Sequence, residues 1–353
     1  MNLTVKKVFI ILMSICLPLS FIACSKPEAP PPVEPKTTEV QIGENNPLTG
    51  DNTLDKCAVG KRPIAVMVEN SPAARPQWGL GSADITLEGL VEGGITRMLW
   101  IYADAASAPK IGPTRSARID YIEWAEGLDA IFVHFGGASN AYEALRTRKV
   151  DNIDGIGKGN LKGGPKYFKR DDTRRNRGIE HSAYTTGEWL SKAISETGVR
   201  YDINLDYIKP FAFFSTTTKL KDGECTSITF AFSSNYKHTF KYNSEDNLYY
   251  NWMNTSEMLD ENGNQMAVTN VILLYMPVTP IPGASGWVNW DQTGGDGIIV
   301  SSGSYENITW TKGNTPGSML KIFDSAGYEM KLNVGKSYIG IVPLKNVSLT
   351  TIA

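Results

Sequence analysis

The hydrophobic pattern of the chain changes near Ser227, and this change limits the folds that the chain can adopt. Before that point, apolar runs that suit buried strands alternate with segments that have the period of a helix. Such alternation is typical of a layered α/β structure. After that point the helical period almost disappears, and short β-rich runs follow one another between Gly, Asn and Asp. The sequence therefore predicts the α+β class, with an N-terminal α/β layered domain followed by a β-rich C-terminal domain.

The elements of each half can be predicted from the same pattern. In the first half we expect strands over 62–69, 95–102 and 129–135, and helices over 114–128, 138–148 and 186–197. In the second half, hairpin turns are expected at 260–264 and 324–327. Nine runs there are expected to be strands: 228–232, 238–242, 248–253, 267–276, 297–300, 308–311, 320–323, 329–332 and 337–342.

The first 23 residues have the pattern of a lipoprotein signal peptide. Lys6 and Lys7 precede an apolar run over residues 8–21, which is too short for a permanent membrane-spanning helix, and Ala23 lies directly before Cys24. We expect cleavage before Cys24 and lipidation of that cysteine, with acyl chains such as palmitate holding the protein on the extracytoplasmic face of the cell membrane. The alternative is an ordinary secretory signal or an N-terminal membrane helix.

Composition and length extend this picture to the rest of the chain. Five prolines between residues 27 and 35 predict an extended tether, so residues 24–50 are interpreted as the lipidated cysteine and a Pro-rich spacer. Loss of residues 1–23 removes two lysines and no acid, leaving 330 residues with 33 basic and 37 acidic side chains. That balance does not favour nucleic acid as a partner. The length suits two domains, which we expect over 51–210 and 211–353.

Two cysteines remain after Cys16 is lost with the signal and Cys24 is lipidated. Cys57 and Cys225 form a candidate disulfide because disulfides persist outside the cytoplasm. Their spacing leaves it equally open that each is a free thiol. The three histidines do not have the spacing of a metal site, and no nucleotide-binding or nucleophile motif is visible. The sequence therefore predicts no metal and no cofactor, and it names no catalytic residue.

Charged residues and glycines are densest between residues 69 and 118. Gly93-Gly94 and Gly112-Pro113 fall at junctions of strand and loop, where open α/β sheets bind ligands, and arginines follow both pairs. If Thr114 or Ser116 begins the next helix, the free N–H groups of that helix would favour a phosphate. The candidate ligand-binding residues are Arg97, Arg115 and Arg118, assisted by Glu92, Glu88, Glu69 and His134, with Arg75 as an outer member.

A structural interpretation of the same residues stays open. The arginines could instead pair with Glu69, Asp84, Glu88 and Glu92, because an unpaired buried charge is costly. His134, at a strand end, could be a satisfied structural residue. His181 follows a basic loop over residues 169–177, which is either solvated surface or a contact with anionic lipid or teichoic acid.

Several motifs resemble one bacterial family. In the first half these are Val91-Glu92-Gly93-Gly94-Ile95-Thr96-Arg97 and Ile111-Gly112-Pro113-Thr114-Arg115. In the second half they are Asn270-Val271-Ile272, Gly294-Gly295-Asp296-Gly297 and Thr309-Trp310-Thr311-Lys312. These motifs are similar to the N- and C-terminal halves of the YerB-like lipoproteins, a domain of unknown function, and the resemblance covers nearly the whole mature chain. It implies a place in the cell envelope of a Gram-positive bacterium, and it implies no particular reaction.

The layout around the arginines is also similar to that of the LytR-CpsA-Psr ligases, which hold a polyprenyl pyrophosphate with arginines. The aspartate that follows arginine in the signatures of those ligases is missing after Arg97 and after Arg115. This puts metal-assisted transfer in doubt and leaves an analogy of layout.

Three hypotheses about function follow. The first, which we favour, is a binding or accessory role in the cell envelope, with the membrane as a partner through Cys24 and an anionic or pyrophosphate-linked ligand at the arginines. The second is an enzyme that acts on a polyprenyl-pyrophosphate or wall-glycan substrate through the same arginines. The third is a protein-interaction partner of a wall synthase.

Overall fold

The computed structural model describes residues 44–158, 161–204, 209–284 and 286–353, all within one compact unit that covers Ile42–Ala353. Cys24, the signal peptide and nearly all of the expected tether lie outside the described residues. Within the described ranges, no helix combines the length and the apolar character that crossing a bilayer requires.

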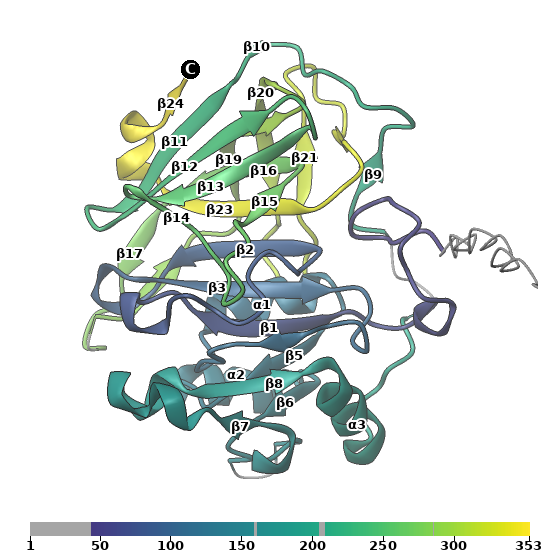
Figure 1. Ribbon diagram of the computed structural model, residues 1–353, viewed down its shortest axis with the longest axis vertical. Helices are drawn as coiled ribbons and strands as arrows, with labels where there is room; N and C mark the ends of the chain where they lie inside the picture. Colours follow the sequence, from purple (N-terminus) through teal and green to yellow (C-terminus); the bar gives the residue numbers. More distant parts are fainter. Residues whose placement is uncertain (1–43, 159–160, 205–208, 285) are drawn as a thin grey trace, which may run out of the picture. The chain divides into compact units, whose positions relative to one another are not determined.

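One mixed sheet of eleven strands contains strands from both halves of the chain (Figure 1). The first half contributes β1 (Ile64–Glu69), β2 (Ile85–Leu90), β3 (Thr96–Tyr102), β5 (Ile131–His134) and β6 (Asn152–Asp154). The second half contributes β10 (Gly223–Glu224), β16 (Asn270–Met276), β19 (Gly294–Ser301), β20 (Ser304–Thr311), β21 (Lys321–Phe323) and β23 (Ser337–Pro343). Their order is β10-β20-β19-β16-β23-β2-β3-β1-β5-β6, with β21 beside β20.

Strand β23 joins the two halves. It pairs in parallel with β16 on one side and with β2 on the other, so that Gly340 lies opposite both Leu273 and Glu88. The main sheet therefore extends across the domain boundary that the sequence analysis places between residues 210 and 211. That boundary stays a prediction, and the structure adds that strands from its two sides pair directly.

A second sheet is built from the C-terminal half alone. Its strands are β11 (Ser227–Ser233), β12 (Tyr236–Asn243), β13 (Leu248–Met253), β14 (Ser256–Glu257), β15 (Ala267–Val268) and β24 (Thr351–Ile352). Smaller pairings join β17 (Val278–Pro280) to β18 (Val288–Trp290) and β9 (Ala212–Phe213) to β22 (Lys331–Leu332). A last group joins β8 (Ala183–Thr186) to β4 (Lys110–Ile111) and β7 (Lys169–Arg170).

The hydrophobic core lies on both faces of the main sheet, because successive side chains of a strand point to opposite faces. One face, which includes Met67 of β1, packs against α1 (Ile119–Gly127) and α2 (Ser139–Thr147). The other face, which includes Val66, packs against α3 (Gly187–Thr197) and against the second sheet. The α+β class and the β-rich C-terminal region are therefore confirmed.

Two of the differences from the predicted elements bear on the predicted site. Strand β2 was not expected, because Glu88 and Gly89 interrupt its apolar run. The helix expected over 114–128 begins only at Ile119, with Arg118 as its N-cap. The segment before it is extended because its backbone bonds to distant strands: Arg115 N donates to Met67 O at 3.0 Å.

Candidate functional site

The strand register brings the predicted site residues to one end of the main sheet. Arg97 in β3 lies opposite Glu69 in β1 and opposite Gly89 in β2. Glu88 directly precedes Gly89, so its side chain points to the other face of the sheet. The sheet thus divides the predicted set, with Arg97 on the face that carries α1 and Glu88 on the face that carries the second sheet.

On the α1 face, Glu92 binds two of the predicted arginines. Glu92 Oε1 accepts a hydrogen bond from Arg97 Nη2 at 2.7 Å, and the same carboxylate accepts hydrogen bonds from Nε and Nη2 of Arg118. Arg97 Nη1 also donates to the Ser116 carbonyl at 2.6 Å. Arg97 is 4% exposed, and burial lowers its pKa to about 10. Arg97 and Arg118 therefore have a carboxylate partner within the chain.

On the opposite face, Glu88 is fully buried among four hydrogen-bond donors. Its carboxylate accepts from Asn70 Nδ2 at 2.8 Å and Thr96 Oγ1 at 2.5 Å, both in the first half. It also accepts from Tyr338 Oη at 2.9 Å and lies 3.3 Å from His238 Nε2, both in the second half. Burial raises the pKa of Glu88, but the interaction with His238 and the hydrogen bonds of Thr96 and Tyr338 together outweigh it, and the net shift is downward. Glu88 therefore links the two halves and is closed to solvent.

Glu69 forms a third cluster, which reaches the surface. Its side chain is 1% exposed; Oε1 accepts from Ser71 Oγ at 2.8 Å and Oε2 accepts from His181 Nδ1 at 2.8 Å. Arg115 Nε forms an ion pair with Oε2 at 3.2 Å. The Arg115 side chain is 24% exposed, and within the described ranges its two terminal amino groups make no hydrogen bond. We call Glu69, Ser71, Arg115 and His181 the Glu69 cluster.

The predicted contribution of a helix N-terminus to this site is wrong. Because α1 begins only at Ile119, the amides that were to face a phosphate are already bonded elsewhere. Thr114 N donates to Ala183 O at 2.8 Å, and Ala117 N donates to Gly136 O at 2.8 Å.

The two remaining predicted residues, His134 and Arg75, lie apart from the three clusters described above. His134 is fully buried, with Nδ1 2.7 Å from Gly136 O and Nε2 3.3 Å from Asn152 Oδ1. Burial lowers the pKa of His134. Arg75 contacts Met253 Sδ from Nη1 at 2.7 Å. The structure gives neither side chain a hydrogen bond or an ion pair with the other predicted site residues.

Two histidines of the clusters were not predicted as site residues. His181 is separated from Glu69 by 112 positions, and His238 is separated from Glu88 by 150. Local spacing carries no signal for such pairs. The alternation of exposed and buried residues in β12 places His238 on the buried side of its strand, and this pattern could have marked it.

The cysteines and the possible metal-ligating side chains form neither a disulfide nor a metal site among the described residues. The candidate disulfide is not formed: Cys57 and Cys225 are free thiols, the first exposed within the short helix η1 (Lys56–Ala58) and the second buried next to β11. In the described part of the chain, no group of three or more His, Cys, Asp or Glu side chains is arranged to hold a metal ion.

Comparison with known proteins gives a consistent result over most of the chain. Residues 48–200 match the family model described as "Protein of unknown function (DUF3048) N-terminal domain", and residues 228–339 match the C-terminal domain of the same family. The chain is 28% identical over 303 residues to "Putative lipoprotein YerB" of Bacillus subtilis (strain 168), covering 84% of this chain and 86% of that one. The crystal structure of the YerB protein from Bacillus subtilis matches with a TM-score of 0.73 at 27% identity, over 87% of this chain and 98% of the other.

Proposed function

Because the chain belongs to the YerB-like family of bacterial proteins, whose domains have no known function, we propose that it is a membrane-anchored lipoprotein with a binding or accessory role in the cell envelope. The anchor in this proposal is acylated Cys24 on the extracytoplasmic face. The ligand in this proposal is an anionic, phosphate-bearing envelope molecule, and the Glu69 cluster is its binding site.

Two observations support the anchor. The residues before Cys24 have the pattern of a lipoprotein signal, and the similar Bacillus subtilis protein carries the word lipoprotein in its name. Replacing Cys24 by Ser should abolish incorporation of labelled palmitate and release the protein from the membrane fraction. A Cys24→Ser protein that is still processed and still labelled would contradict the proposed anchor.

The observation that carries the proposed binding site is the state of Arg115. Its Nε lies against the buried Glu69 carboxylate, which holds the guanidinium in place, while its terminal amino groups make no hydrogen bond within the described ranges. A planar guanidinium that is fixed on one side and free on the other suits bidentate binding of a phosphate. The charge of Arg115 also helps to lower the pKa of Arg170, after burial and Arg175, so several cations act on this region. Arg97 and Arg118 differ in that both already bind Glu92.

The test compares the full chain, purified in detergent, with two arginine variants. We expect inorganic pyrophosphate to raise the melting temperature of the wild type and to leave that of Arg115→Gln unchanged. Arg200→Gln is the matched control, because Arg200 pairs with Asp129 next to the start of β5, at the opposite end of the β1–β5 pair from Glu69. An equal shift in all three proteins, or no shift in the wild type, would contradict the proposed site.

One contact favours the second candidate function, an enzyme. The hydrogen bond from His181 Nδ1 to Glu69 orients the imidazole ring and turns Nε2 away from the Glu69 carboxylate, as a general base requires, and Nε2 lies 3.7 Å from Glu180 Oε1. Ser71 does not complete a nucleophilic triad, because its hydroxyl donates to the carboxylate. Release of phosphate from pyrophosphate by the wild type and not by His181→Asn would favour the enzyme. Binding without release would favour the binding role.

A further inference from the structure

A polar cavity of about 470 Å³ lies where α1 of the first half meets strands of the second half. Its volume falls within the range of about 300–1,000 Å³ that is usual for small-molecule sites. We call it the Lys312 cavity. It is lined by Glu123 of α1, Pro277 and Thr279 at β17, residues 289–293 from β18 to β19, and residues 312–316 after β20.

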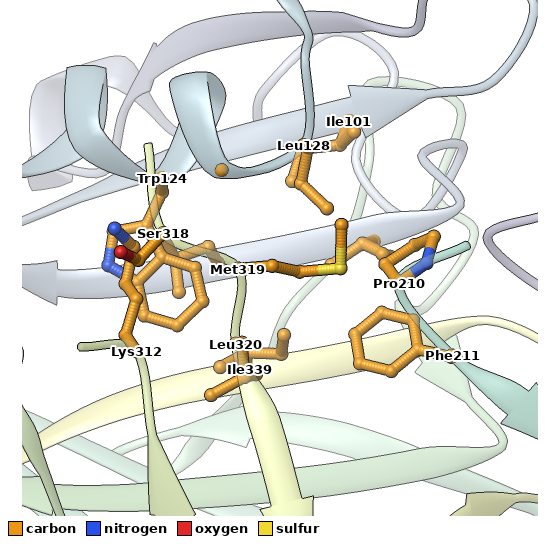
Figure 2. Close-up of a pocket in the computed structure, with 13 residues that line it drawn as sticks. Ile101, Trp124, Leu128, Pro210, Phe211, Lys312, Ser318, Met319, Leu320 and Ile339 are labelled. Atoms are coloured by element: carbon orange, nitrogen blue, oxygen red, sulfur yellow. The ribbon is translucent and has the colours of Figure 1, made fainter. Parts of the chain in front are cut away.

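Lys312 is the unusual residue of this cavity. The residue is only 3% exposed, and its amine makes no hydrogen bond or ion pair with the described residues. The stem of Lys312 also borders a narrow apolar cavity, where it lies beside Trp124 and Ser318 (Figure 2). The amine is 6.0 Å from the centroid of the Trp124 ring. A buried ammonium group without an acceptor is costly, so an acceptor supplied by a ligand would stabilise it.

A second group of this cavity lacks a hydrogen-bond donor. Gln292 Nε2 donates to Glu123 Oε2 at 3.0 Å, which fixes the orientation of the amide, while Gln292 Oε1 is buried without a partner. Trp124 Nε1 is also buried without a partner, but Trp124 lines the narrow apolar cavity and not the Lys312 cavity. Gln292 is 7% exposed and lines the same cavity as Lys312. Buried polar atoms in native structures nearly always have partners, so the free Gln292 Oε1 beside Lys312 suits a ligand that brings a donor.

The rim of the cavity has a different character from its floor. It consists of exposed amide, hydroxyl and carboxylate side chains, namely Asn289, Asp291, Thr293, Asn314 and Thr315. Amides and hydroxyls both donate and accept hydrogen bonds, which is what the hydroxyl groups of a sugar require. The carboxylates of Glu123 and Asp291 disfavour a ligand with several negative charges, such as a phosphate, because like charges repel.

We propose that the Lys312 cavity binds a sugar ring that carries a single carboxylate, with the ammonium of Lys312 on the carboxylate and the rim side chains on the hydroxyl groups. Trp290 does not serve as a stacking platform in this arrangement. It is buried against Tyr121, and its indole Nε1 donates to Leu90 O at 3.1 Å. The proposal goes beyond the function proposed above, because it uses none of the residues of the Glu69 cluster.

The test measures binding of glucuronate to the full chain in detergent, with glucose as the uncharged counterpart and acetate as the carboxylate without a ring. We expect glucuronate to bind the wild type more tightly than glucose or acetate does. Lys312→Met keeps the apolar stem and removes the charge, and it should weaken glucuronate binding by about 10–100-fold, the effect of losing one hydrogen bond to a charged group.

Lys336→Met is the matched control. Lys336 is a half-buried lysine whose amine donates to Gly81 O at 2.7 Å, and it does not line the cavity. This variant should keep wild-type affinity for glucuronate. Near-UV circular dichroism checks that both variants fold. Equal binding of glucuronate and acetate, no binding by the wild type, or unchanged affinity in Lys312→Met would each overturn the proposal. Because pyrophosphate is tested through Arg115, failure at one site leaves the other proposal standing.

Discussion

Replacing Glu88 by Ala tests whether this predicted ligand residue belongs to the scaffold. The substitution removes the acceptor of Asn70, Thr96 and Tyr338 and the carboxylate that lies against His238 Nε2, all within a fully buried site. Leaving a buried donor without its acceptor costs about 1–3 kcal/mol, and three donors lose theirs here, so the cost is at least about 3–5 kcal/mol. That is a large fraction of the roughly 5–15 kcal/mol by which a typical protein is stable. We therefore expect a free energy of unfolding lower by about 3–5 kcal/mol.

The assay is urea unfolding of the wild type, Glu88→Ala and the exposed-site control Glu143→Ala, followed by circular dichroism and by hydrogen exchange. Since two donors come from each half, peptides of β3 and of β12 should lose protection together in the Glu88 variant. The control should stay within about 0.5 kcal/mol of the wild type, as surface substitutions usually do. A Glu88→Ala protein of wild-type stability that loses a ligand would refute the reasoning and return Glu88 to the binding site.

The pH dependence of this contribution has a defined sign. The net shift lowers the pKa of Glu88 below its ordinary value of 4.5. A carboxylate with a lowered pKa stabilises the fold fully above its unfolded pKa, and this stabilisation is lost as the pH falls through the folded value. The stability difference between wild type and Glu88→Ala should therefore shrink as the pH falls below 4.5.

Three further predictions concern burial and packing. Burial raises the pKa of Asp120 from 3.8 to about 7. The wild type should therefore lose stability relative to Asp120→Asn as the pH rises from about 4 to about 7, and should lose no more above pH 7. Urea unfolding at pH 5, 7 and 8 measures this difference. Maleimide should modify the folded protein at exposed Cys57 and not at buried Cys225, because burial raises the pKa of the Cys225 thiol to about 11. In denaturant both cysteines should be modified, and mass spectrometry identifies the modified sites. Gly89→Ala should lower the free energy of unfolding by about 1–3 kcal/mol, because its new Cβ would lie 2.3 Å from Cζ2 of Trp290; wild-type stability would show that the ring can shift.

The sequence predicted those elements whose signal is local. The apolar run of Ile64–Glu69 is buried at every position, as a central strand requires, and the pattern was sufficient to place it. Strand β2 was missed because its Glu88 resembles a surface residue, and two of the four groups that make its burial tolerable are 150 and 250 positions away. The start of α1 was misplaced for a similar reason, since long-range backbone bonds hold the preceding segment extended.

The candidate site shows the same limit. Glu92 and Arg97 are five residues apart, and their pairing was among the alternatives that the sequence left open. The contact of Glu69 with His181 depends on where the chain returns after α2, which no local pattern records. The sequence also does not predict that Lys312 is buried without a partner, because a lysine at the end of a polar strand is usually exposed to solvent.

The two proposed sites differ in which halves of the chain they contain, and a ligand at each site would therefore stabilise different parts of the fold. The Glu69 cluster is built from the first half alone, whereas the Lys312 cavity takes Glu123 from α1 and its other walls from the second half. Hydrogen bonds already join the two halves at this cavity: Trp290 N donates to Asp120 Oδ1 at 2.9 Å, and Gln292 Nε2 donates to Glu123 Oε2. A ligand in the Lys312 cavity would therefore contact both halves and stabilise the whole unit against unfolding, while a ligand on Arg115 would contact only the first. The two sites can thus act independently in one protein, because their occupancy is linked only through the stability of the shared sheet.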